Sequence, residues 1–313
     1  MKLKLNKKNK GEFYSPDFNN LKSLLNDNFK LFFNFFTYDK WDLLINIVHL
    51  ALIEDGEDLT SKGIFKESDR ADAYIIAKQD TICSSLPLID IILMCLSDKN
   101  RVKYLKKDGD IAIKGEKIAL ISGPAIDILK GERVILNFLS HLFGISTYTN
   151  KFVQKLKNSK TKLLDTRKTL PGHRYLDKYA VLVGGGKNHR MDLSEMLMVK
   201  DNHIDRAGSI TKAVTSLRNK YKDLCPPIIV ECRNIEEAKE AVKLKVDRIL
   251  LDNMNPSQLQ ECIKLIPPHI ETEISGGINV DNIEKFAHLG AHYISVGAIT
   301  KDAPCIDLSM NIL

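Results

Sequence analysis

The sequence predicts an α/β protein made of an N-terminal α+β domain and a C-terminal domain of repeated βα units. Its 313 residues exceed the usual size of a single core, and its 44% hydrophobic and 27% charged residues are typical of globular proteins. The first part contains short alternating strand patterns bounded by turns. The second part repeats an apolar run that ends in a charged or glycine-rich turn.

The first part, up to about residue 130, is expected to build an antiparallel sheet. Strands are predicted at Ala73–Ala77 and Lys117–Ile121, and the pattern from Gly109 to Pro124 resembles successive hairpin strands. Residues 1–30 are expected to form a flexible N-terminal extension that carries a cluster of lysines. From Gly131 apolar residues recur every three or four positions, which predicts a long connecting helix.

The second part predicts a parallel sheet. Its apolar runs end near Asp165, Lys200, Glu231, Asp252, Ser275 and Gly297. The last three steps span 21, 23 and 22 residues, the length of one βα unit with a short helix. Such units form either a closed barrel or an open, doubly wound sheet. The polar or glycine-rich group at every strand end favours the barrel, whose active site forms at the carboxyl ends of the strands.

Composition narrows the kind of partner and the compartment. A net charge of +6 suits anionic ligands, but no nucleic-acid motif with interleaved aromatic residues accompanies it. The six cysteines form no C-x-x-C pair, so neither a zinc site nor a disulfide framework is expected. The apolar run from Leu43 to Ile53 is too short to span a bilayer, and no secretory signal is visible. We therefore expect a cytoplasmic protein that binds neither membranes nor nucleic acid.

Cationic side chains concentrate between Asp165 and Ile204. Arg167, Lys168, Arg190 and Lys200 each lie beside a predicted strand end or glycine turn, where they can bind carboxylates or phosphates. The alternative for each is an ordinary solvated surface charge. His189 has two equally supported interpretations, a hydrogen-bond donor to a carboxylate or a structural histidine.

Later strand ends supply carboxylates and glycines. Glu231 and Asp252 can hold Mg²⁺ or bind sugar hydroxyls, although each could instead cap the following helix. Glycines that follow a strand let backbone N–H groups approach a phosphate. The alternative is that these glycines only allow the chain to turn. The two candidate phosphate turns are Ser275-Gly276-Gly277 and Val296-Gly297-Ala298.

Several long motifs resemble the quinolinate phosphoribosyltransferase family over residues 45–313. They are DTRKTLPGHR, GGGKNHRMDLSEMLMVKDNHI, VECRNIEEAKEA, LLDNM, ISGGI and ISVGAITK. The resemblance implies an N-terminal α/β sandwich and an incomplete, TIM-like α/β barrel, assembled as a homodimer or higher oligomer. We expect these domains at residues 31–135 and 136–298, with residues 299–313 returning to the first. The implied reaction converts quinolinate and 5-phosphoribosyl-1-diphosphate, with Mg²⁺, to nicotinate mononucleotide, diphosphate and CO₂ for NAD biosynthesis.

The resemblance also implies individual roles. Arg133 would reach into the neighbouring subunit's site. Arg167, His189 and Arg190 would hold the quinolinate carboxylates, and Thr166 would line the substrate site. Lys168 and Lys200 would serve both substrates, Glu231 and Asp252 would face the ribose and Mg²⁺, and the Ser275 and Val296 turns would bind the 5-phosphate. The alternatives are a related enzyme acting on nicotinate or a ModD-like substrate, and a non-catalytic ligand sensor.

Overall fold

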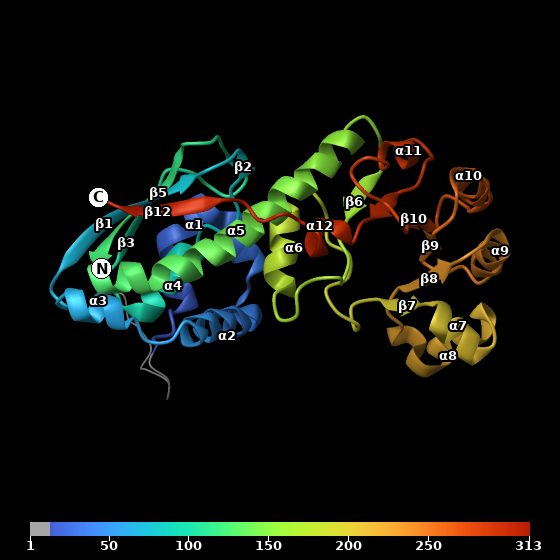
Figure 1. Ribbon diagram of the computed structural model, residues 1–313. Helices are drawn as coiled ribbons and strands as arrows, with labels where there is room; N and C mark the ends of the chain where they lie inside the picture. The colour runs from blue at the N-terminus through green and yellow to red at the C-terminus, as the bar shows by residue number, and fades with distance from the viewer. Residues whose placement is uncertain (1–12) are drawn as a thin grey trace. The chain divides into compact units, whose positions relative to one another are not determined.

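The chain forms two compact units in a computed structural model that describes residues 13–313 (Figure 1). The first unit holds the described residues up to Thr147 together with Ala303–Leu313, and the second holds Tyr148–Asp302. The lysine cluster at positions 2 to 10 lies outside the described residues. Within residues 13–313, no helix is both long and apolar enough to cross a membrane.

The first unit begins with three helices. These are α1 (Phe18–Phe35), α2 (Tyr38–Glu54) and α3 (Leu59–Ile64). The expectation of a flexible extension through residue 30 is wrong for the part from Phe18 onward. The side chain of Asp17 caps α1 by accepting a hydrogen bond from the Asn20 N–H, and Phe18, Leu21 and Leu25 are buried on one face of the helix.

A four-stranded antiparallel sheet also belongs to the first unit. Its strands are β1 (Arg70–Ala77), β3 (Arg101–Tyr104), β5 (Lys117–Pro124) and β12 (Leu308–Ile312), in the order β12-β1-β5-β3. The expected hairpin between Gly109 and Pro124 is wrong, because β4 (Ile111–Ala112) pairs with β2 (Thr81–Ile82) and not with β5. Helix α4 (Leu88–Leu96) is buried along almost its whole length, as its uniformly apolar sequence requires.

One long helix, α5 (Ala125–Leu156), contributes to both units. It begins six residues before the predicted Gly131 and runs without a break through the expected domain boundary at residue 135. The chain divides instead between Thr147 and Tyr148, and it returns to the first unit at Ala303. At Gly144 an added Cβ would lie 2.3 Å from the Pro304 carbonyl oxygen, so glycine lets the returning segment pass against the helix.

The second unit contains six parallel strands. They are β6 (Lys162–Leu164), β7 (Leu197–Val199), β8 (Ile228–Cys232), β9 (Arg248–Asp252), β10 (Glu271–Ser275) and β11 (Tyr293–Ser295), in the order β6-β11-β10-β9-β8-β7. Among the described residues no ladder joins β6 to β7, so the barrel is incomplete. Each strand ends within two residues of the position predicted from the sequence.

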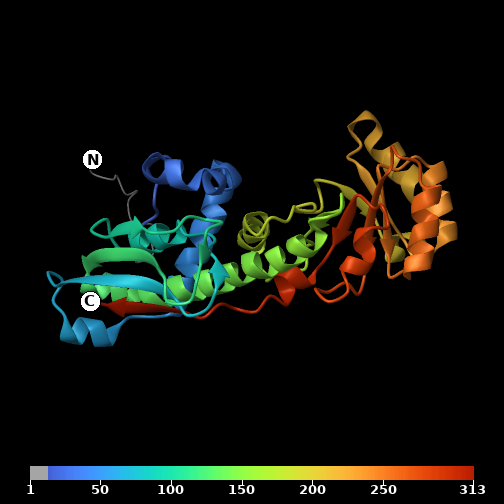
Figure 2. The ribbon, with the colours of Figure 1, turned by 90° about the horizontal axis from the view of Figure 1, so that it is seen from above.

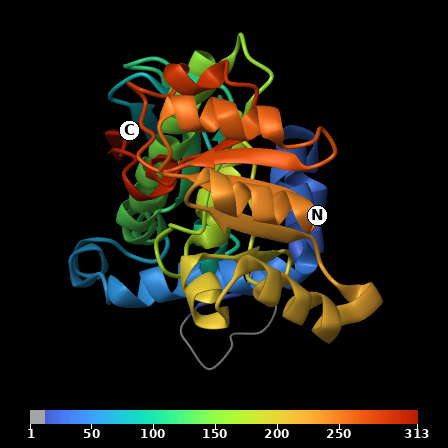
Figure 3. The same cartoon turned by 90° about the vertical axis from the view of Figure 1, so that its right-hand side faces the viewer.

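Helices lie between these strands and after the last one. They are α6 (Arg174–Val183), α7 (Asp201–Ala207), α8 (Ile210–Tyr221), the 3₁₀ turn η1 (Lys222–Leu224), α9 (Ile235–Lys243), α10 (Pro256–Leu265), α11 (Glu284–Ala287) and α12 (Ala298–Lys301). Figures 2 and 3 show α9 and α10 on one face of the sheet, covering the strands they connect. The fold is therefore an N-terminal α+β unit followed by an incomplete α/β barrel.

Candidate active site

A cleft of about 350 Å³ lies at the carboxyl ends of the parallel strands in the second unit. Because parallel strands all end at the same edge, this is where polar residues after each strand meet. The cleft contains eleven of the fifteen predicted site residues. They are Thr166, Arg167, Lys168, His189, Arg190, Lys200, Glu231, Asp252, Ser275, Gly276 and Gly277.

The two predicted carboxylates enter the cleft from neighbouring strands. Asp252 ends β9 opposite Ser275 of β10 in the ladder. Glu231, near the end of β8, lies 3.1 Å from the Lys200 ammonium that follows β7. The Glu231 side chain is only 14% exposed, whereas that of Lys200 is 46% exposed and can turn towards a ligand. The cleft therefore contains both acceptors for hydroxyls or a cation and an accessible positive charge.

The glycine turn after β10 is shaped by a close approach of the backbone. Gly276 has φ +97°, and an added Cβ would lie 2.3 Å from Asn253 Oδ1 and 2.7 Å from the Asn253 nitrogen. Gly277 also has a positive φ, +60°, but a Cβ added there would meet no other atom within 4 Å. Of these two glycines, Gly276 is therefore the one at which both the backbone conformation and the lack of room for a side chain require glycine.

The turn after β11 packs against the segment that follows β6. An added Cβ at Gly297 would lie 2.8 Å from Lys168 Cδ and 3.4 Å from Thr166 Oγ1, and the Thr300 hydroxyl donates a 2.8 Å hydrogen bond to the Lys168 carbonyl. Val296, Gly297 and Ala298 do not themselves line the cleft. In this structure they hold Thr166 and Lys168 in place from behind.

A buried ion pair anchors the two cationic segments to each other. Lys178 Nζ lies 2.5 Å from Asp165 Oδ1 and donates a second bond of 2.9 Å to the His189 carbonyl. The same Asp165 oxygen accepts the His189 N–H at 2.8 Å, and Asn188 Nδ2 lies 2.6 Å from Asp165 Oδ2. The residues after Asp165 and those around His189 are therefore fixed by one network.

The two arginines of the cleft are close enough for the charge of Arg167 to act on Arg190. Burial and, secondarily, the neighbouring charge of Arg167 lower the pKa of Arg190. Arg190 Nη1 donates to the Met196 carbonyl at 2.8 Å, while the buried Nε of Arg167 has no hydrogen-bond partner in residues 13–313. An anion bound between these guanidinium groups would relieve their repulsion and supply the missing acceptor.

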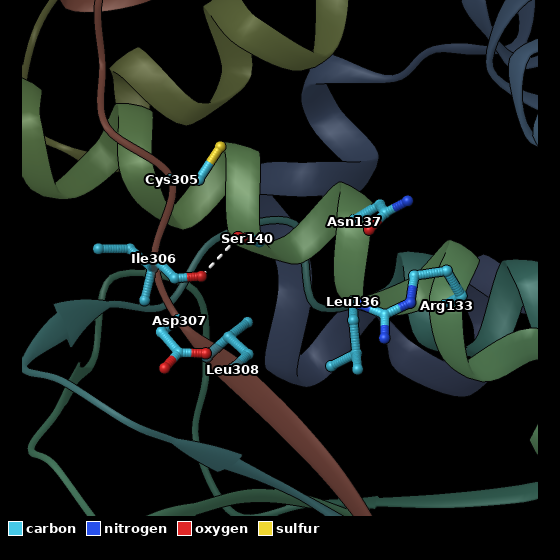
Figure 4. A pocket seen from close by; sticks show the side chains of 8 residues that line it. All are labelled: Arg133, Leu136, Asn137, Ser140, Cys305, Ile306, Asp307 and Leu308. Carbon is cyan, nitrogen blue, oxygen red and sulfur yellow. Dashed lines mark hydrogen bonds between the residues drawn. The ribbon is translucent and has the colours of Figure 1, made fainter.

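Arg133 belongs to a different place in the fold. It is exposed on α5 in the first unit, beside a pocket of about 290 Å³ that α5 forms with residues 305–308 (Figure 4). The Ser140 hydroxyl donates to the Ile306 carbonyl across this pocket, which joins the helix to the returning C-terminal segment. Arg133 is therefore not among the residues that line the cleft of the second unit.

Family models match both parts of the chain. The N-terminal domain of quinolinate phosphoribosyl transferase matches residues 58–143, and the C-terminal domain of the same family matches residues 145–311. The chain belongs to the quinolinate phosphoribosyltransferase family.

Relatives of known name agree with this family membership. The chain is 40% identical to a probable nicotinate-nucleotide pyrophosphorylase [carboxylating] of Bacillus subtilis, over 86% of this chain and 92% of the relative. It is 38% identical to the chloroplastic nicotinate-nucleotide pyrophosphorylase [carboxylating] of Arabidopsis thaliana, over 88% of this chain and 83% of the relative. The crystal structure of NadC from Streptococcus pyogenes superposes with a TM-score of 0.82 at 36% identity, covering 86% of this chain and 95% of that one.

The quinolinate phosphoribosyltransferase cleft also contains residues that the sequence did not single out. These are Met198, Leu250, Asn253, Glu273 and Ser295. Glu273 is the most consequential, since its side chain is fully buried beneath the cleft. A signal was available: Glu273 precedes Ser275 by two residues in a strand, so both side chains point to the same face of the sheet.

Proposed function

We propose that the protein is a decarboxylating quinolinate phosphoribosyltransferase. The reaction joins quinolinate to 5-phosphoribosyl-1-diphosphate and releases diphosphate and CO₂, giving nicotinate mononucleotide for NAD biosynthesis. The observation that carries the proposal is the cleft itself. Arg167, Lys168, Arg190 and Lys200 converge there with the carboxylates of Glu231 and Asp252. This is the charge distribution needed by one small dianion and one phosphorylated sugar.

The arginines are assigned to quinolinate. Its two adjacent carboxylates are planar acceptors, and guanidinium groups bind such acceptors through paired N–H donors. Arg167 and Arg190 provide these groups, and the repulsion between them favours a bound dianion. Lys168 and Lys200 act as point charges towards carboxylate and phosphate oxygens. His189 forms part of the wall of the same site.

Glu231 and Asp252 are assigned to the ribose and to Mg²⁺. Residues 13–313 contain no group of three or more histidine, cysteine, aspartate or glutamate side chains that could hold a metal by themselves. Two carboxylates nevertheless fit this ion, because Mg²⁺ is commonly held by one or two carboxylates together with water and substrate phosphates. When bound, Mg²⁺ neutralises charge on the diphosphate. The Ser275-Gly276-Gly277 turn offers backbone N–H groups to the 5-phosphate.

The chemistry then depends on positioning and electrostatics. As the bond from ribose C1 to diphosphate breaks, positive charge develops on the sugar, and Glu231 and Asp252 stabilise it. The quinolinate ring nitrogen forms a bond to C1 and becomes a pyridinium. Its positive charge accepts the electron pair of the bond to the 2-carboxylate, so CO₂ leaves and C2 takes up a proton. The cleft needs no strong general base for this sequence.

The functional assembly is proposed to be a homodimer or a higher oligomer of the same chain. Arg133 is exposed on the first unit and has no ion-pair partner among the described residues, and we assign it to the cleft of a neighbouring subunit. All six cysteines are free, which suits the reducing cytoplasm to which we assign the protein.

A product assay tests the proposal. Purified protein is incubated with quinolinate, 5-phosphoribosyl-1-diphosphate and Mg²⁺, and nicotinate mononucleotide and CO₂ are measured together. Equal amounts of both products are expected. Product from nicotinate without CO₂ would point to a related pyridine-carboxylate transferase, and binding without turnover would point to a ligand sensor. Either result would overturn the proposal.

A further inference from the structure

Both ring nitrogens of His189 are turned into the protein. Nδ1 accepts a hydrogen bond of 2.7 Å from the backbone N–H of Arg190. Nε2 is buried, has no acceptor in full hydrogen-bond geometry within residues 13–313, and lies 3.3 Å from Glu273 Oε2. A nitrogen that accepts a hydrogen bond cannot carry the proton, so the arrangement requires the neutral ring with its proton on Nε2, facing Glu273. His189 therefore has no ring N–H directed to a ligand in the cleft.

Glu273 is the residue that faces this proton. Its side chain is fully buried in the middle of β10, and its Oε2 is shared between His189 Nε2 and Arg248 Nη1, the latter at 3.0 Å. Burial by itself would raise the pKa of Glu273, but hydrogen-bonding contacts with His189 and Ser295 and the charge of Arg248 outweigh burial and lower the pKa. Its ion pair with Arg248 places a carboxylate oxygen of Glu273 as the acceptor that faces His189.

Arg248 connects Glu273 to a second acid farther from the cleft. Arg248 Nη2 lies 2.6 Å from Glu271 Oε2, and the Tyr293 hydroxyl donates to Glu271 Oε1 at 2.9 Å. The Glu271 side chain is 42% exposed, and its partners among the described residues are Arg248 and Tyr293. The two acids thus share one arginine, but only Glu273 also meets the histidine.

We propose that Glu273 is a positioning residue for the dicarboxylate substrate, acting through His189 on Arg190. Glu273 fixes the His189 ring with its proton on Nε2, and that ring in turn fixes the Arg190 backbone through Nδ1. Arg190 is thereby held where its guanidinium reaches the cleft. His189 shapes the site without donating a ring hydrogen bond to the substrate. The identity of the dicarboxylate as quinolinate rests on the proposed function, but the protonation state of the ring does not.

The protonation state is measured first, in the wild-type protein without substrate. The protein is labelled with ¹⁵N-histidine, and the His189 ring signals are identified by their absence from a His189→Gln variant. Couplings between ring protons and nitrogens then distinguish the two nitrogens. The expected result is a neutral ring protonated on Nε2. A ring protonated on Nδ1, or on both nitrogens at neutral pH, would overturn the inference even if no variant of Glu273 can be purified.

Substitutions then test the consequence for binding. Glu273→Leu removes the acceptor, and Glu273→Gln keeps a carbonyl oxygen that can take its place. Glu273→Leu is expected to raise the quinolinate KM roughly tenfold, the lower end of the loss seen when a partner that orients a metal-bound histidine is removed. The KM for 5-phosphoribosyl-1-diphosphate should hardly change, and Glu273→Gln should recover most of the loss. Equal losses for both substrates, or no loss in Glu273→Leu, would contradict the proposal.

Glu271→Leu is the matched control. It makes the same change in the same strand and removes the other partner of Arg248, but it leaves the contact with His189 intact. Its quinolinate KM is expected to stay near wild type, and a rise equal to that of Glu273→Leu would overturn the role of His189. If the wild-type protein binds quinolinate by calorimetry but forms no product, the proposed function fails, while the binding and ring measurements still test the positioning role.

Discussion

Lys178 and Asp165 form an ion pair in which both side chains have an exposed fraction of 0%. Burial lowers the pKa of Lys178 and raises that of Asp165, and the attraction between the two partners opposes both shifts. Because the pair also holds the backbone of His189, it links two segments that are separated in the sequence, one after β6 and one after α6. The ion pair therefore helps to hold the two segments of the cleft in their observed positions.

Lys178→Met is expected to destabilise the protein strongly. Removing one partner leaves a buried carboxylate without its counter-charge, which costs about 3–5 kcal/mol. The free energy of unfolding is measured by chemical denaturation. Lys155→Met is the matched control, because Lys155 pairs with Glu284 at 3.0 Å at the surface and its loss should cost at most about 1 kcal/mol. Equal costs for the two variants would contradict the role assigned to the buried pair.

Asp90 should make stability depend on pH. It is buried, accepts a 2.6 Å hydrogen bond from the Tyr104 hydroxyl, and burial raises its pKa from 3.8 to about 6. Because the folded state holds this proton more tightly than the unfolded state, protonation of Asp90 contributes stability. The contribution is fully present below the unfolded pKa of 3.8 and is lost as the pH rises through the folded pKa of about 6. The full shift corresponds to about 3 kcal/mol, and most of it should be lost from the free energy of unfolding between pH 4 and pH 7.

Asp90→Asn tests that dependence, because asparagine does not titrate. The variant should gain stability relative to wild type as pH rises from 4 to 7, when both are unfolded by denaturant at several pH values. Asp98→Asn, which replaces an acid exposed at the surface, is the control and should track wild type across the range. A constant difference between Asp90→Asn and wild type would rule out the raised pKa.

Two adjacent glycines should respond differently to alanine. Gly276→Ala places a Cβ 2.3 Å from Asn253 Oδ1 and at φ +97°, so the turn and Asn253 must move. A displacement of about 1 Å in the site lowers kcat/KM on the order of 100-fold. Gly277→Ala meets only the conformational cost of φ +60°, about 1 kcal/mol of stability. Steady-state kinetics with both substrates distinguishes them, and similar losses would show that space around Gly276 is unimportant.

Features of this site that depend on local sequence pattern could be predicted, whereas contacts between residues far apart in the sequence could not. The strand ends near Glu231, Asp252 and Ser275 could be found because apolar runs and polar turns alternate along the chain. The partnership of Asp165 with Lys178 could not, because both look like surface charges in the sequence and only packing buries them together. The orientation of the His189 ring was equally hidden, since it depends on Glu273, 84 positions later in the chain.

The domain boundary escaped prediction for a related reason. The pattern of apolar residues in α5 continues across Thr147 without interruption, so periodicity gives no sign of where one unit ends. The hairpin expected before Pro124 failed because β4 has only two residues and pairs with β2 instead. Short strands carry too little pattern to specify their partners.

Glu231→Gln should weaken both catalysis and activation by Mg²⁺. The substitution keeps the shape of the side chain but removes the charge that we assign to the developing positive sugar, and the loss of one such electrostatic group lowers kcat about 100- to 1,000-fold. The Mg²⁺ concentration for half-maximal activity should also rise. Glu236→Gln, which removes an exposed charge on α9, should change neither quantity. An unchanged kcat in Glu231→Gln would exclude it from the reaction.

Mixing two inactive variants tests whether Arg133 acts in a neighbouring subunit. Arg133→Ala lacks the arginine that we assign to the neighbouring subunit's cleft, and Lys168→Ala lacks a cation of its own cleft. Each variant should therefore have little activity alone. In a mixed dimer, one cleft combines an intact Lys168 from its own chain with an intact Arg133 from the other chain. After denaturation and refolding of an equal mixture, activity should return to about a quarter of wild type, because half of the dimers are mixed and each has one complete cleft. If Arg133 served its own chain, no mixed dimer would contain a complete site, and the mixture would remain as inactive as its components.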